Sequence, residues 1–301
     1  MRRIDLVSVL LAVAVPLAAQ DPAQSSPRPG AGMDGASAAV SVALDSHGQT
    51  LDCRFFRAEG DGLRPTVLLV PGWPGNPEDV LGLGARLSGR GINALMVMPR
   101  GMHGSGGTFT FAGSLEDIGV AWRWLHSDAA AERFGIDRAR VTLGGYSWGG
   151  GMALAYAATD PDVRAVFSIA GTDHGEFIRL MQQNPDMDRQ VRAMWAKALA
   201  PDGPVRGDAD FVYDEMVQGQ RTYGLRENAA ALADRRILMV GGWDDRNITI
   251  EHLLLPVYRA LKANGADDVT FVAYQDGHGF SRVRARLAAD IVTWLTGEPQ
   301  R

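Results

Sequence analysis

The stretch Gly145-Tyr146-Ser147-Trp148-Gly149 decides the fold of this 301-residue chain. It follows the apolar run 141–143 and precedes the helix-forming run 152–158, which ends at a Thr-Asp-Pro breaker. A serine flanked by glycines at such a junction predicts a strained turn from a strand into a helix, because the chain passes too close for side chains on either side. The turn would lift the Ser147 hydroxyl out of a sheet, and the helix N-terminus would offer free N–H groups to an anion.

Strand and helix patterns alternate on both sides of this turn. Strands are expected at residues 39–44, 51–58, 66–70, 92–98, 163–169, 237–240 and 269–274, the first two as a hairpin. Helices are expected to begin at Pro77 with Asn76 as the N-cap, to begin at Ser114, to end at Gly135 and to span 283–294. This alternation predicts an α/β fold, with a mostly parallel sheet that carries helices on both faces.

The alternation breaks between residues 172 and 234. A crossover between parallel strands needs only a dozen or so residues, so this much longer connection predicts a small helical lid insertion. Its aromatic and methionine side chains are expected mainly to pack the lid onto the body of the protein, with substrate contact as the alternative for each.

The N-terminus has the pattern of an export signal. Arg2 and Arg3 are followed by an apolar stretch and by Leu17-Ala18-Ala19, which predicts a signal peptide over 1–19 that is cleaved after Ala19. The stretch is shorter than the roughly 20 residues that a spanning helix needs, so stable membrane insertion is not expected. Residues 20–37 are rich in Pro, Gly, Ser and Ala and predict a disordered linker before a single domain at 38–301. The mature protein is therefore expected to be secreted or periplasmic.

Composition narrows the classes of ligand. The formal net charge is -5 without a run of Lys or Arg, which argues against nucleic-acid partners. The single cysteine, Cys53, lies in an alternating strand pattern and is expected to be a buried apolar residue. The sequence lacks H-E-x-x-H, paired C-x-x-C, Walker A and a complete dinucleotide motif, so we expect neither a metal nor another cofactor.

Two further loops supply the partners that a serine nucleophile needs. The acids of Gly241-Gly242-Trp243-Asp244-Asp245 follow one expected strand, and His278 follows the last strand between two glycines. Polar groups of open α/β sheets collect at the carboxyl ends of their strands. The chain order Ser147, Asp244, His278 is the order expected for a nucleophile, an orienting acid and a base in such a sheet.

With these motifs the chain resembles the alpha/beta-hydrolase superfamily, most closely its dienelactone-hydrolase-like and prolyl-oligopeptidase-like branch. The resemblance covers residues 39–296 and rests on the serine turn, on Gly241 to Arg246 and on Gly277-His278-Gly279-Phe280. It implies that the first acid of the pair, Asp244, orients His278, while Asp245 is a partly exposed partner of Arg246 or of the loop backbone. By position it also implies an oxyanion hole made by the backbone N–H groups of Trp73 and Trp148.

The expected activity is hydrolysis of a carboxylic ester through an acyl-enzyme. The serine favours ester or amide chemistry over the lactone chemistry of dienelactone hydrolases, which use cysteine. A serine peptidase acting on short peptides is one alternative, and a non-catalytic binding protein on the same fold is another. Trp73, Trp148 and Trp243 flank the expected site, either as an aromatic pocket or as braces for the loops.

Overall fold

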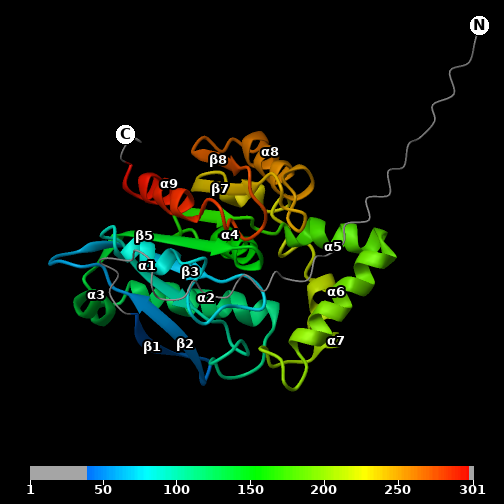
Figure 1. Ribbon diagram of the computed structural model, residues 1–301, viewed down its shortest axis with the longest axis horizontal. Helices are drawn as coiled ribbons and strands as arrows, with labels where there is room; N and C mark the ends of the chain where they lie inside the picture. The colour runs from blue at the N-terminus through cyan, green and yellow to red at the C-terminus, as the bar shows by residue number, and fades with distance from the viewer. Residues whose placement is uncertain (1–38, 298–301) are drawn as a thin grey trace, which may run out of the picture.

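One twisted sheet organises the molecule (Figure 1). The computed structural model describes residues 39–297, and within them eight strands pair in the order β1-β2-β4-β3-β5-β6-β7-β8. The strands are β1 (Val40–Ser46), β2 (Gln49–Phe56), β3 (Arg64–Val70), β4 (Asn93–Val97), β5 (Ile136–Tyr146), β6 (Ala165–Ile169), β7 (Arg236–Gly242) and β8 (Val269–Tyr274). Strands β4 to β8 and β3 run parallel, while β2 is antiparallel to both β1 and β4. This arrangement confirms the α/β prediction.

The hairpin at the sheet edge forms where the sequence predicts it. Ser46 pairs with Gln49, so the connection has two residues, His47 and Gly48. Their φ angles are 54° and 77°, as a turn that matches the twist of its strands requires. Cys53 on β2 is fully buried and free, and burial raises the pKa of its thiol. The cysteine is therefore an inert core residue, as its alternating pattern indicates.

Helices cover both faces of the sheet. They are α1 (Leu83–Ser88), α2 (Phe111–Leu125), α3 (Asp128–Phe134), α4 (Trp148–Thr159), α5 (His174–Gln183), α6 (Pro185–Ala198), α7 (Ala209–Gln218), α8 (Leu255–Ala263) and α9 (Arg284–Thr296), with short helical turns at Ala229–Leu232 and Ile250–Leu254. α2 packs beside α4, and α1 packs beside α9. The inner strands β3, β4, β6 and β7 are buried over most of their lengths, as strands that are covered on both faces are.

Two helix starts differ from the prediction. α1 begins at Leu83 rather than at Pro77, because Asn76 accepts the N–H of Glu78 in a local turn and Asp79 caps the later helix through the N–H groups of Gly84 and Ala85. α2 begins one turn before Ser114: Thr110 is its N-cap, and its hydroxyl accepts the N–H of Gly113. Ser114 instead lies inside the helix and donates back to the carbonyl of Thr110. Gly135 ends α3 with a φ of 66°, as predicted.

The segment 172–234 contains α5, α6 and α7, on the side of the molecule toward which the arrowheads of β5 and β7 point (Figure 1). It is attached to the body by a β-bridge between Met102 and Val205 and by backbone bonds of Arg206 with Gly101 and Phe109. The carboxylate of Glu215 on α7 also accepts two N–H groups at the start of α2. These contacts attach the segment to the body of the protein at several points.

The predicted signal peptide, its cleavage site and the linker over 20–37 lie outside the described residues. Among residues 39–297, no helix is long and apolar enough to span a membrane.

Candidate active site

Ser147 occupies the junction of β5 and α4. Its φ of 54° and ψ of -122° are unusual for a residue with a side chain, which is the backbone strain that the motif predicts. The strained geometry is held by the backbone: the Ser147 N–H donates to the carbonyl of Ile169, and the Ser147 carbonyl accepts the N–H groups of Gly151 and Thr172. The side chain is thereby fixed at the carboxyl end of β5.

The two glycines of the motif are sterically required. A Cβ on Gly145 would lie 2.2 Å from the carbonyl oxygen of Gly149, and a Cβ on Gly149 would lie 2.2 Å from the carbonyl oxygen of Pro71. Neither backbone oxygen can move aside as a flexible side chain could. The G-x-S-x-G spacing therefore follows from the packing of α4 against the loop after β3.

His278 lies on the loop after β8 and contacts the serine directly. Its Nε2 is 2.9 Å from Oγ of Ser147, and its Nδ1 is 2.7 Å from Oδ2 of Asp245. Because a carboxylate only accepts, Nδ1 carries the proton and Nε2 is left to accept the serine hydroxyl. The phenol of Tyr146 donates to the carbonyl of His278 at 3.1 Å, so the residue before the serine also holds the histidine backbone.

The prediction that Asp244 lies against His278 is wrong by one residue. The Asp244 carboxylate is 47% exposed and accepts from Gln275 and Arg282. The Asp245 side chain is fully buried instead. Besides His278, it accepts the backbone N–H groups of Asn247 and Ile248 through Oδ1. The expected bonds to the loop backbone are present, but the expected exposure of Asp245 is not.

The length of β7 explains the shift. Gly241 and Gly242 still pair with β8, and the backbone pairing continues as Trp243 donates to Tyr274 and Asp244 donates to Asp276. The chain then turns, with the Asp245 N–H donating to the Gly242 carbonyl. Asp244 thus still takes part in the backbone pairing and keeps an exposed side chain. Asp245 is the next residue, and its side chain is buried against His278. Neither glycine reveals in the sequence where the strand ends.

The two expected oxyanion donors lie beside Ser147. Trp148 is the first residue of α4, so its N–H has no acceptor within the helix. On the other side, a Cβ on Gly72 would be 3.2 Å from Cβ of Ser147, which places the loop of Trp73 against the serine. The backbone N–H groups of Trp73 and Trp148 remain the predicted oxyanion hole.

An aromatic cluster packs the predicted lid onto these two residues. Trp195 of α6 lies 4.1 Å from Trp73 between ring centroids, and Phe109 lies 5.5 Å from Trp148. All four side chains are buried. Trp73 and Trp148 therefore pack against segment 172–234 and its surroundings, whereas Trp243 is 54% exposed.

His174, at the start of α5, is a buried histidine beneath the same cluster. Its ring meets Phe111 edge-on at 5.4 Å, and its Nε2 is 3.3 Å from the carbonyl of Trp148. Burial lowers the pKa of His174 to about 4, so the ring stays neutral at ordinary pH. A neutral ring that bonds the first turn of α4 has a structural task.

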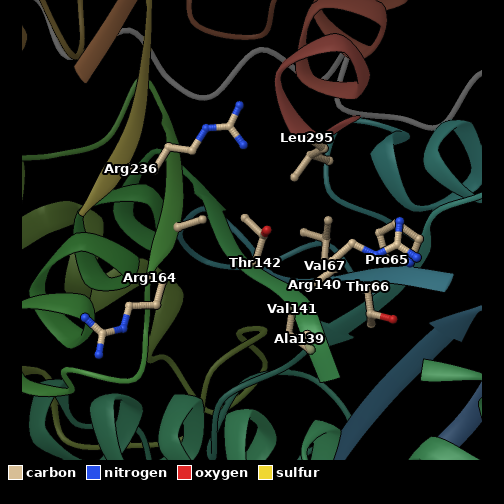
Figure 2. A pocket seen from close by; sticks show the side chains of 11 residues that line it. Pro65, Thr66, Val67, Ala139, Arg140, Val141, Thr142, Arg164, Arg236 and Leu295 are labelled. Atoms are coloured by element: carbon tan, nitrogen blue, oxygen red, sulfur yellow. The ribbon is translucent and has the colours of Figure 1, made fainter. Parts of the chain in front are cut away.

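A cavity of about 160 Å³ lies at the opposite, amino edge of the sheet (Figure 2). Arg140, Arg164 and Arg236 border it, but Figure 2 shows their guanidinium groups pointing away from one another. Arg140 is also paired with Asp137 at 2.6 Å. This cavity is separate from Ser147, and its arginines do not converge on a common ligand position. Within residues 39–297, no three His, Cys, Asp or Glu side chains are grouped as a metal ion would require.

Comparisons with known proteins identify the family and the fold. The alpha/beta hydrolase fold model matches residues 65–236. Among solved structures, Est1E from Butyrivibrio proteoclasticus is 14% identical, with a TM-score of 0.60 over 85% of this chain and 98% of its own. The Pyrococcus furiosus esterase Pf2001 is 12% identical, with a TM-score of 0.62 over 86% of this chain and 90% of its own.

The Pyrococcus horikoshii acylaminoacyl peptidase is 17% identical, with a TM-score of 0.61 over 86% of this chain but only 41% of its own. No curated protein matches the sequence. At these identities, the likeness to the solved structures concerns the fold.

Proposed function

The chain belongs to the alpha/beta hydrolase fold family, and from this premise we propose that it is a serine hydrolase that cleaves carboxylic esters through an acyl-enzyme. One observation carries the proposal: Ser147, His278 and Asp245 form a continuous chain of hydrogen bonds of 2.9 and 2.7 Å. Serine is a weak nucleophile until a base removes its proton, and this chain provides both the base and the group that orients it.

In the acylation step, Oγ of Ser147 attacks the ester carbonyl carbon while Nε2 of His278 takes the hydroxyl proton. The carbonyl oxygen becomes an oxyanion that the backbone N–H groups of Trp73 and Trp148 stabilise. Asp245 keeps the Nδ1 proton in place and stabilises the imidazolium. The tetrahedral intermediate then expels the alcohol, which leaves with the proton from His278.

The second half of the cycle uses the same groups. His278 takes a proton from water as the hydroxide attacks the acyl carbon bound to Ser147. The new tetrahedral intermediate collapses, the carboxylic acid leaves, and the proton on Nε2 returns to Oγ. The enzyme is regenerated without a cofactor.

A substrate panel tests the reaction class. We expect turnover of p-nitrophenyl esters of graded acyl length, with little activity on aminoacyl p-nitroanilides. Ser147→Ala should fold normally and lose at least ~10³-fold in turnover, because it removes the nucleophile and little buried packing. A panel in which only the anilides react would replace the esterase with a peptidase. Ester turnover that survives Ser147→Ala, or a purified protein that a fluorophosphonate probe does not label, would contradict the serine mechanism.

We also propose that the protein is exported, which rests on the sequence pattern of residues 1–19. Mass spectrometry of the extracellular or periplasmic protein should find an N-terminus at Gln20 or a near neighbour. Recovery of the chain in the membrane fraction with Met1 intact would contradict cleavage.

A further inference from the structure

Asp276 is a buried carboxylate that the proposed mechanism does not use. It lies two residues before His278, and its side chain is only 5% exposed. An ionised carboxylate in such a place needs several donors to offset its desolvation.

The donors come from both ends of the loop that carries His278. The N–H of Gly277 donates to Oδ1 of Asp276 at 2.8 Å, and the N–H of Arg282 donates to Oδ2 at 2.8 Å. Nε of Arg282 also donates to Oδ1 at 3.2 Å. Gly277 precedes the histidine and Arg282 follows it, so one side chain closes the loop around His278.

The same residue also joins this loop to the loop of Asp245. Its carbonyl accepts the N–H of Asp244 at 3.0 Å, and a Cβ on Gly242 would lie 2.5 Å from that oxygen. Arg282 also reaches both loops, because its Nη2 donates to the Asp244 carboxylate at 2.8 Å and to the Gln275 carbonyl at 2.9 Å. The histidine loop and the acid loop are thus held as one unit.

From these contacts we propose that Asp276, acting with Arg282, is a positioning residue for the reaction. It sets the place of His278 relative to Ser147 and Asp245 without touching the substrate. The proposal rests on the serine hydrolase function, since only that chemistry requires the imidazole to keep hydrogen-bond distance to two elements at once. A displacement of about 1 Å at such a group can cost on the order of 10²-fold in rate.

The test compares Asp276→Asn, Arg282→Gln and the double variant, with esters as substrates. Asp276 accepts from Arg282 through both carboxylate oxygens, whereas asparagine has only one oxygen that can accept. A glutamine at 282 cannot make all the bonds of the guanidinium. We expect each single change to lower kcat about 10- to 100-fold and to leave KM within about twofold, because the lid and the oxyanion donors are untouched. The double variant should lose little more than either single one, since the bond from Nε of Arg282 to Oδ1 of Asp276 is the side-chain contact that both changes remove.

Charge effects and general destabilisation are separated by design. Asp276→Asn removes a negative charge and Arg282→Gln a positive one, so a purely electrostatic role would shift the acid limb of the pH profile in opposite directions. Displacement of His278 should instead lower the plateau value of kcat in both variants. Asp137→Asn is the control: Asp137 likewise accepts from a backbone N–H, that of Ala139, and from Nε of an arginine, Arg140, but it lies at the amino end of β5, away from His278.

Several results would overturn the positioning role. They are a wild-type kcat in Asp276→Asn, a loss that appears in KM alone, additive losses in the double variant, or an equal loss in Asp137→Asn. If Asp276→Asn does not fold, the exposed Arg282→Gln decides alone, by the same kcat and KM criteria. Failure of the underlying function has a different signature, namely ester turnover in Ser147→Ala or none in the wild type.

Discussion

Nδ1 of His278 lies 2.7 Å from the carboxylate of Asp245, while the carboxylate of the adjacent Asp244 lies 2.8 Å from Arg282 at the surface. Two neighbouring acids of one loop therefore have separate tasks. Asp245 is buried and accepts from the imidazole and from two backbone N–H groups, so its carboxylate is held in a fixed orientation. Asp244 ties the loop to its neighbour.

Asp245→Asn should lower kcat about 10²- to 10⁴-fold. The amide can turn a donor toward Nδ1 and so favour the wrong imidazole tautomer, and it stabilises the imidazolium less. Asp244→Asn should change kcat less than about tenfold, because the exposed pair with Arg282 contributes little. Steady-state ester kinetics of the two variants check the pair. A crippled Asp244→Asn beside a nearly normal Asp245→Asn would contradict the observed geometry.

Tyr146→Phe should lower kcat about 3- to 10-fold and leave KM nearly unchanged. The phenol holds the carbonyl of His278, and a single hydrogen bond of this kind contributes roughly 1 kcal/mol. The aromatic ring itself stays, so its packing against Gly72 is retained. Tyr156→Phe is the control, because it removes a phenol of α4 that donates to Asp160 just after the end of that helix, away from the histidine. Equal kcat values for wild type and Tyr146→Phe would show that the bond is not needed.

The sequence predicted the sheet, the serine turn and the histidine because each has a local physical signature. The apolar run 66–70 is typical of a strand that is covered on both faces, and glycines at 145 and 149 are needed because a Cβ there would lie 2.2 Å from a backbone oxygen. The choice between Asp244 and Asp245 was not predictable, because it depends on the pairing of β7 with a strand that is distant in the sequence. Asp245 faces inward because β7 pairs with β8 through Gly242, and no pattern within the loop reveals that register.

The helix starts show the same limit. Asn76 and Pro77 form a good N-cap pattern, but Asp79 bonds to later N–H groups and the helix begins where that carboxylate lies. No sequence pattern indicates the roles of Tyr146 and Asp276 either. Tyr146 donates to the backbone of the His278 loop, and Asp276 accepts a backbone N–H from Arg282, at the other end of its own loop.

Gly149→Ala should abolish activity and destabilise the protein by about 2 kcal/mol or more. The added Cβ would lie 2.2 Å from the carbonyl oxygen of Pro71 and 2.5 Å from that of Val70, so the loop of Trp73 or the start of α4 must move. Gly89→Ala is the control, because its nearest neighbour, the carbonyl of Ala85, is 3.6 Å away. Urea unfolding and ester turnover of both variants measure the effect, and a stable, active Gly149→Ala would refute the steric account.

His174 should make the free energy of unfolding depend on pH. Burial holds the pKa of His174 at about 4 in the folded protein, whereas the unfolded chain takes up the proton near 6.5. Between these values the unfolded state binds more protons, so the contribution of His174 is full above pH 6.5 and is lost as the pH falls to about 4. The full loss is on the order of 3 kcal/mol. Asp79, whose pKa burial raises to about 6, works in the opposite direction, so the wild-type profile alone does not isolate the histidine.

His174→Gln isolates it, because glutamine retains a donor for the Trp148 carbonyl and does not titrate. We expect the free energy of unfolding of the wild type to fall relative to that of the variant as the pH is lowered from 7 to 4.5, since only the wild type has an imidazole that resists protonation when folded. Urea unfolding at both pH values gives the two differences. A difference between wild type and variant that is the same at both would mean that the buried imidazole is protonated as readily in the folded protein as in the unfolded chain.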